Sequence, residues 1–148
     1  GEDGLYDAAL KAKEQGKIRH ISITNHRLTV AHQAIDSGLY ETLQFPFSYL
    51  AGEQEMELVQ KCREKNMGFI AMKGMAGGLI QDGITAAAWM DTQEGVVPIW
   101  GVQRESELDQ FLKCIRERTS GDYRKRPQRT MRRVLPWLRI LYAMSGRH

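Results

Sequence analysis

Polar side chains and glycines follow directly after short apolar runs at four places in this sequence. The four stretches read TNH at residues 24–26, LQFP at 43–46, MKGMAGG at 72–78 and GVQR at 101–104. Asn25 and Gln44 each carry an amide donor and an amide acceptor in one side chain. Lys73 and Arg104 carry charges that attract phosphate, and glycines such as Gly74 let the backbone approach a flat or charged ligand closely. These residue types favour binding of a ligand that combines a carboxamide, such as that of nicotinamide, with phosphate.

Each of these signals also has a structural interpretation that the residues alone leave open. Thr24 and Asn25 could cap a helix that begins near residue 28, and the glycines could serve only to turn the chain. Lys73 and Arg104 could be solvated, while His20 is expected to be packed within a strand. The sequence shows no nucleophile–base pair, no metal-ligand spacing and no phosphate-binding P-loop.

Strand and helix patterns alternate along the first 115 residues. Apolar spacing predicts helices over residues 5–15, 29–37, 53–65, 85–90 and 105–115, and strands over 18–24, 41–45, 67–72 and 96–102. Such alternation indicates an α/β fold with parallel strands joined by crossover helices. The last two strands are apolar almost throughout, which is typical of strands buried on both faces. About four such units form half of a (β/α)8 TIM barrel; the alternative is a small open sheet with helices on both faces.

Charge is distributed unevenly along the 148 residues. Residues 116–148 contain ten Lys or Arg but only two Asp or Glu, although the whole chain carries a net charge of only +3. Cys62 and Cys114 have no C-x-x-C spacing, so we expect reduced thiols in a cytoplasmic protein, with Cys62 as a small buried side chain on a helix. The sequence therefore predicts an acidic domain over residues 1–115, followed by a basic, irregular or helical tail over 116–148.

Four segments, taken in order, resemble the aldo/keto reductase family. They are GKIRHISITNH, ETLQFPFSYL, GFIAMKGMAGGLI and VVPIWGVQRESELDQFL. The likeness runs from about residue 4 to residue 112 and is closest to the bacterial branch that carries a C-terminal iron–sulfur segment. It implies a TIM barrel and NAD(P)H-dependent reduction of carbonyl compounds, with this chain supplying strands five to eight, the C-terminal half of the barrel.

The resemblance also implies a cofactor site for NADP or NAD. The family's Ser/Thr-Asn pair that holds the carboxamide matches Thr24 and Asn25, and Met72 replaces an aromatic ring that often stacks under the nicotinamide. Phe111 stands where the family usually has Asn, so the choice between NADPH and NADH stays open. The implied cofactor-binding residues are Thr24, Asn25, Gln44, Met72, Lys73, Gly74, Gly101, Gln103 and Arg104.

The family's catalytic Asp, Tyr, Lys and His belong to the first four strands, so the resemblance assigns no catalytic residue in this chain. No metal ligand is predicted either. We expect a fragment of a reductase that is inactive alone, without measurable cofactor affinity, and that either aggregates or forms a homodimer closing the barrel. The alternative is a half-barrel module that binds NADP without turnover. The sequence does not indicate the substrate.

The resemblance stops after Leu112, where the iron–sulfur branch continues with a cysteine-rich stretch. This chain has no cysteine beyond Cys114. If the codons of residues 135–148 are read one nucleotide later, they permit CRGCGYCMPCPAGI, which is similar to a ferredoxin-type cluster run. We therefore expect the tail to be an out-of-frame translation, beginning between Lys113 and Tyr123, that has lost the iron–sulfur ligands. In that case neither nucleic acid nor membrane is a partner; the alternative is a membrane or nucleic-acid adaptor acting through the tail.

Overall fold

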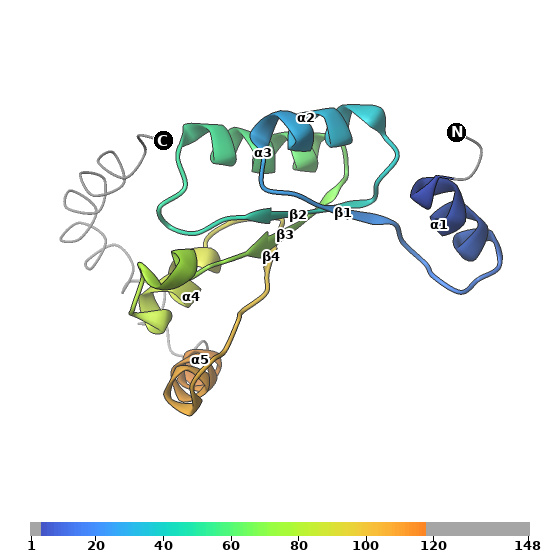
Figure 1. Cartoon of the computed structure of the whole chain (residues 1–148). Coiled ribbons are helices and arrows are strands. Elements are labelled where there is room, and N and C mark those ends of the chain that lie inside the picture. Colours follow the sequence, from blue (N-terminus) through green and yellow to red (C-terminus); the bar gives the residue numbers. More distant parts are fainter. Residues whose placement is uncertain (1–3, 118–148) are drawn as a thin grey trace.

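A computed structural model describes residues 4–117 of the chain (Figure 1). Its centre is one four-stranded parallel sheet in the order β1-β2-β3-β4. The strands are β1 (Ser22–Thr24), β2 (Thr42–Pro46), β3 (Gly68–Met72) and β4 (Val96–Pro98). The register pairs Thr24 with Gln44 and Pro46 with Met72, so the carboxyl ends of the strands meet at one edge of the sheet. The predicted α/β fold with parallel strands is confirmed.

Five α-helices alternate with these strands. They are α1 (Leu5–Glu14), α2 (Leu28–Ser37), α3 (Glu53–Glu64), α4 (Gly83–Met90) and α5 (Glu105–Glu117), with a 3₁₀ turn η1 (Ala76–Gly78) between β3 and α4. Figure 1 shows α2 and α3 side by side over one face of the sheet. Helices α4 and α5 pack against each other after β3 and β4, close to the strand ends that carry the predicted site.

The two faces of the sheet differ in burial. In β2, Leu43 and Phe45 are buried, whereas the alternate residues Thr42 and Gln44 are only half-buried. Since successive side chains of a strand point to opposite faces, one face packs on the helices and the other stays more open. Side chains from α2 and α3 complete the buried side: Ala31, Ile35, Leu58, Val59 and Cys62.

Three predictions about the outer strands are wrong. The last strand was expected to be buried on both faces, yet Val97 is 61% exposed, because it is in register with Ile70 and Gln44 on the more open face of the sheet, and Ile99 is 43% exposed. The strand expected over residues 18–24 begins only at Ser22. His20 is therefore not packed within a strand: its side chain is 67% exposed and contacts the Glu41 carboxylate.

The prediction for Cys62 is confirmed, because this residue is fully buried on α3 and its thiol is free. Within residues 4–117 no helix is both long and apolar enough to cross a bilayer. The predictions for the tail fall on residues outside the described part of the chain, apart from the start of residues 116–148, where α5 extends to Glu117.

Candidate functional site

Asn25 follows the end of β1 and lies beside Gln44, which is in the middle of β2. The Asn25 backbone N–H donates to the Gln44 carbonyl oxygen at 3.2 Å, which extends the ladder between the two strands. The Gln44 side chain donates from Nε2 to the Sδ atom of Met72 on β3, at 3.6 Å. Thr24, Asn25, Gln44 and Met72, all predicted site residues, are thus linked across β1, β2 and β3 by strand pairing and these hydrogen bonds; we call this group the amide row.

Asn25 has an incomplete set of hydrogen bonds. Its Oδ1 accepts from the backbone N–H of Arg27 at 3.3 Å, a short turn that leads into α2. Its Nδ2 is buried and has no hydrogen-bond partner among the described residues. The residue at the N-cap of α2 is Arg27, not Thr24 or Asn25, so capping does not account for this side chain. A buried donor without an acceptor is costly, and a ligand carbonyl at this point would remove that cost.

Met72 is less accessible than its predicted role suggests. It is only 8% exposed, and a sulfur atom is a weak hydrogen-bond acceptor. The bond from Gln44 to Met72 can therefore be exchanged for a stronger bond to a ligand oxygen. Whether Met72 also lies under a bound ring stays a prediction.

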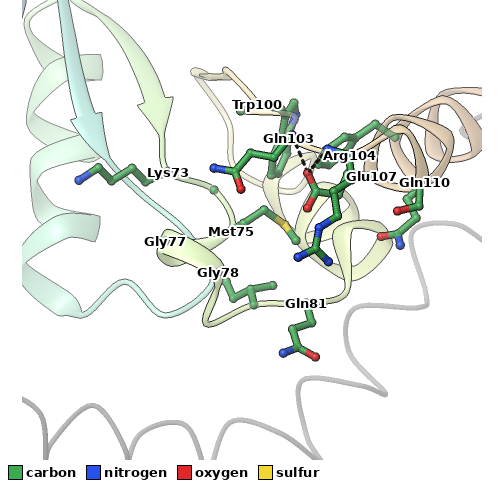
Figure 2. Close-up of a pocket in the computed structure, with 15 residues that line it drawn as sticks. Lys73, Met75, Gly77, Gly78, Gln81, Trp100, Gln103, Arg104, Glu107 and Gln110 are labelled. Carbon is green, nitrogen blue, oxygen red and sulfur yellow. Dashed lines mark hydrogen bonds between the residues drawn. The ribbon is translucent and has the colours of Figure 1, made fainter.

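Beside the amide row lies a pocket of about 660 Å³ (Figure 2). It lies between the loop that follows β3 and the loop that follows β4. The other predicted site residues all line it: Lys73, Gly74, Gly101, Gln103 and Arg104. The fold thus gathers the nine predicted residues into two adjoining groups, which are linked through the sequence neighbours Met72 and Lys73.

Gly74 determines how closely the two loops of the pocket approach. A Cβ atom at this position would lie 2.4 Å from Cζ3 of Trp100, a separation that side chains do not tolerate. The Trp100 ring packs in turn against the Phe111 ring of α5, with centroids 4.7 Å apart. Trp100 was not among the predicted site residues, yet it forms an aromatic wall of the pocket, and no sequence pattern singles it out.

The loop after β3 has an unusual backbone. Lys73, Ala76, Gly77 and Gly78 all adopt positive φ, at 56°, 48°, 67° and 96°. This conformation is uncommon for residues other than glycine. Figure 2 shows the Lys73 side chain extending away from Arg104 and Glu107, so its backbone lines the pocket while its ammonium is directed elsewhere.

The loop after β4 is held by a carboxylate that the sequence predictions missed. Glu107 Oε2 accepts from the backbone N–H groups of Gln103, at 2.8 Å, and of Arg104, at 3.3 Å (Figure 2). A Glu that bonds back to the N–H groups at the start of its own helix is a known capping arrangement. The position of Glu107, three residues after Arg104, was the sequence signal that could have identified this cap.

The family model described as "Aldo/keto reductase family" matches residues 4–96 of the chain. The chain belongs to the aldo/keto reductase family. Among solved structures it is similar to the thermostable aldo-keto reductase Tm1743, crystallised in complex with the inhibitor epalrestat. The TM-score is 0.59 at 18% sequence identity, over 84% of this chain and 54% of that one. No curated protein matches the chain.

The chain therefore spans about half the length of that solved reductase. The predicted family and the predicted partial TIM barrel are both confirmed. The likeness to the iron–sulfur branch stays a prediction. Within residues 4–117, no cluster of His, Cys, Asp or Glu side chains could hold a metal ion.

Proposed function

We propose that this aldo/keto reductase chain provides the nicotinamide-nucleotide site of an NAD(P)H-dependent reductase of carbonyl compounds. The observation that carries the proposal is the buried Asn25 Nδ2 donor, which has no partner among the described residues and lies on the residue that follows β1. A carboxamide oxygen matches this donor, and a carboxamide is the polar group that orients a nicotinamide ring.

The amide row and the pocket have complementary tasks in this proposal. Asn25 and Gln44 hold the carboxamide end, where the cofactor supplies a hydride when bound. The adjoining 660 Å³ pocket accepts the remainder of the dinucleotide, with its glycine-rich loop on one side and Arg104 on the other. These residues bind and orient the cofactor, and we assign none of them to proton transfer.

We propose no turnover by the chain alone. Carbonyl reduction needs a proton donor beside the carbonyl oxygen, and the resemblance assigns the family's catalytic Asp, Tyr, Lys and His to strands that precede those described. A second candidate, a module that binds NADP without turnover, is favoured by the pocket, which loops of this chain form by themselves. Both candidates predict cofactor binding without turnover, so the affinity separates them: a Kd of about 1 μM or tighter would favour the module, whereas weaker binding favours a fragment with an incomplete site.

Fluorescence titration of NADPH and of NADH with the full chain tests the proposal. Replacing Asn25 by Ala removes the unpaired donor and should weaken binding about tenfold, the value of one hydrogen bond to a buried group. His26→Ala, at the neighbouring exposed residue, is the matched control and should bind as the parent chain does. Absence of binding, or equal binding by the Asn25→Ala variant, contradicts the proposal, as does carbonyl-dependent oxidation of NADPH by the chain alone.

We further propose a cytoplasmic protein whose tail is out of frame relative to an iron–sulfur branch ancestor and plays no part in binding. The support is the codon degeneracy of residues 135–148 and the +8 charge of residues 116–148 that it would explain. Sequencing of the coding DNA tests this, since codons for Leu135 and Leu138 that do not end in G contradict it.

A further inference from the structure

Glu107 has a free carboxylate oxygen in the pocket. Both of its hydrogen bonds, from the N–H groups of Gln103 and Arg104, go to Oε2. Oε1 has no hydrogen-bond or ion-pair partner among residues 4–117, and the side chain is half-buried and lines the pocket. One oxygen thus organises the loop, while the other can accept a hydrogen bond from a ligand.

The same bonds make this end of the pocket unfavourable for a phosphate group. Backbone N–H groups at a helix N-terminus ordinarily attract anions, but here a carboxylate already occupies two of them. A phosphate placed beside Glu107 would meet a like charge in a partly buried site, where charges interact more strongly than in water. The Arg104 side chain lines the same pocket (Figure 2), but among residues 4–117 it forms no ion pair with the Glu107 carboxylate, which is bonded to backbone N–H groups instead.

The groups around Glu107 suit an adenosine with free ribose hydroxyls. A carboxylate accepts hydrogen bonds from a ribose diol, as it does in sites that select NAD over NADP in dinucleotide-binding folds. The neighbouring Trp100 and Phe111 rings pack on each other and provide an apolar aromatic surface against which an adenine base can pack.

We infer that Glu107 is a specificity-determining residue that selects a nucleotide with an unmodified 2′-hydroxyl, so that the cofactor is NADH in preference to NADPH. This inference rests on the proposed function, because it concerns the adenosine end of the same dinucleotide site.

Calorimetric titration of the full chain with 5′-AMP and with adenosine 2′,5′-bisphosphate tests the inference, since these two probes differ only in the 2′-phosphate. The parent chain should bind 5′-AMP about tenfold more tightly, a margin set by repulsion between like charges. Glu107→Gln keeps an acceptor for the two N–H groups but loses the charge. The variant should therefore bind 5′-AMP and the bisphosphate with about equal affinity. Glu107→Asp keeps the charge and should keep the preference.

Glu105→Gln is the matched control, because Glu105 is exposed on the same helical turn and does not line the pocket. If Glu105→Gln lost as much of the preference for 5′-AMP as Glu107→Gln, the inference would be overturned. The preference would then depend on the overall charge of the chain and not on Glu107. Tighter binding of the bisphosphate by the parent chain overturns the inference but leaves the proposed function standing. Binding of neither probe overturns the inference, while the NADH titration with the Asn25→Ala variant tests the proposed function separately.

Discussion

At the scale of single residues, the contact between Gly74 and Trp100 defines the shape of the pocket. Gly74→Ala would place a methyl group 2.4 Å from the indole ring and force Trp100 away from Phe111. We expect this overpacking to lower the free energy of unfolding by about 1–3 kcal/mol. It should also weaken nucleotide binding. Urea denaturation and NADH titration measure the two effects.

Gly101→Ala provides the control for this prediction. Gly101 lines the same pocket, but a Cβ atom there would meet nothing within 4 Å. Its free energy of unfolding should stay within about 0.5 kcal/mol of the parent value. Equal losses in the two variants would show that the close contact with Trp100 is not what matters.

Cys62 should make stability depend on pH in the alkaline range. Burial raises the pKa of its thiol from 9.0 to about 11. The unfolded chain therefore ionises first as the pH rises, and the stabilising contribution of the buried neutral thiol, at most about 3 kcal/mol, is lost between these two values. Urea denaturation at pH 8, 9, 10 and 11 should show a steeper loss of stability in the parent chain than in Cys62→Ala. Parallel curves would contradict this prediction.

The residues that sequence could identify are those whose chemistry is visible without a fold. Asn25 and Gln44 carry amides at the ends of apolar runs, and the structure brings the two residues together. Trp100 and Glu107 could not be identified in this way. The role of Trp100 depends on contact with Gly74, which is 26 positions earlier in the sequence, and that of Glu107 depends on where the pocket forms.

At the scale of elements, α4 depends on one cap. The Asp82 carboxylate accepts from the backbone N–H groups of Ile84, at 3.0 Å, and Thr85, at 3.2 Å, and from the Thr85 hydroxyl at 2.5 Å. Asp82→Ala should lower the free energy of unfolding by about 1 kcal/mol, and Asp82→Asn, which retains an acceptor, by much less. Chemical denaturation of the three proteins tests this order; an Asn variant as unstable as the Ala variant would contradict it.

Helix α1 is held to the rest of the domain by few contacts. It has no buried residue, and in Figure 1 it stands apart from the sheet. Tyr6 packs on Tyr40 and donates to the Leu39 carbonyl oxygen at 2.9 Å, while Lys13 and His20 both contact the Glu41 carboxylate. Hydrogen bonds from Lys13 and His20 lower the pKa of Glu41 below 4.5.

Acid should therefore release α1. A carboxylate with a lowered pKa stabilises the fold above its ordinary value and loses that contribution as the pH falls through the folded value. Glu41→Gln should speed hydrogen exchange across residues 5–14 at pH 7, and the difference from the parent should shrink as the pH falls below 4.5. Glu57→Gln, at an exposed position on α3, should leave this exchange unchanged.

Sequence predicted the existence of the elements better than the ends of the strands. The helix expected over residues 53–65 is observed as Glu53–Glu64, because its apolar residues fall on one face. Strand β4 ends at Pro98 although the apolar run continues to Val102. A strand persists only where a neighbour accepts its hydrogen bonds; the last such bond joins the Ile99 N–H to the Ala71 carbonyl oxygen at 2.9 Å. That limit depends on the neighbour, not on the residues of β4 themselves.

At the scale of the whole molecule, the exposed apolar side of β4 should promote self-association. Val97 in β4, and Ile99 and Val102 in the segment that follows it, are each more than 40% exposed. Among residues 4–117 the outer edge of β4 is unpaired, and an unpaired apolar strand edge readily adds another strand. Light scattering coupled to size-exclusion chromatography should show dimers or larger species at about 50 μM, a concentration in the range where exposed strand edges associate. A monodisperse monomer would contradict this prediction.

Val97→Lys should reduce this association, because a charge on an edge strand opposes pairing. Leu79→Lys is the control: Leu79 is similarly exposed, at 63%, but lies in the loop after β3 and not on the sheet. Equal effects of the two substitutions would indicate that general solubility, and not the edge of β4, governs association.

Within residues 4–117 the strand order follows the chain order, so each strand pairs only with its nearest neighbours along the sequence. Every pairing closes a short loop, and none waits for a distant segment. A newly made chain can consequently pair each strand with the preceding one as the two leave the ribosome, before the next strand has been synthesised. A mutation that prevents β4 from joining would leave the β1–β2 and β2–β3 ladders able to form.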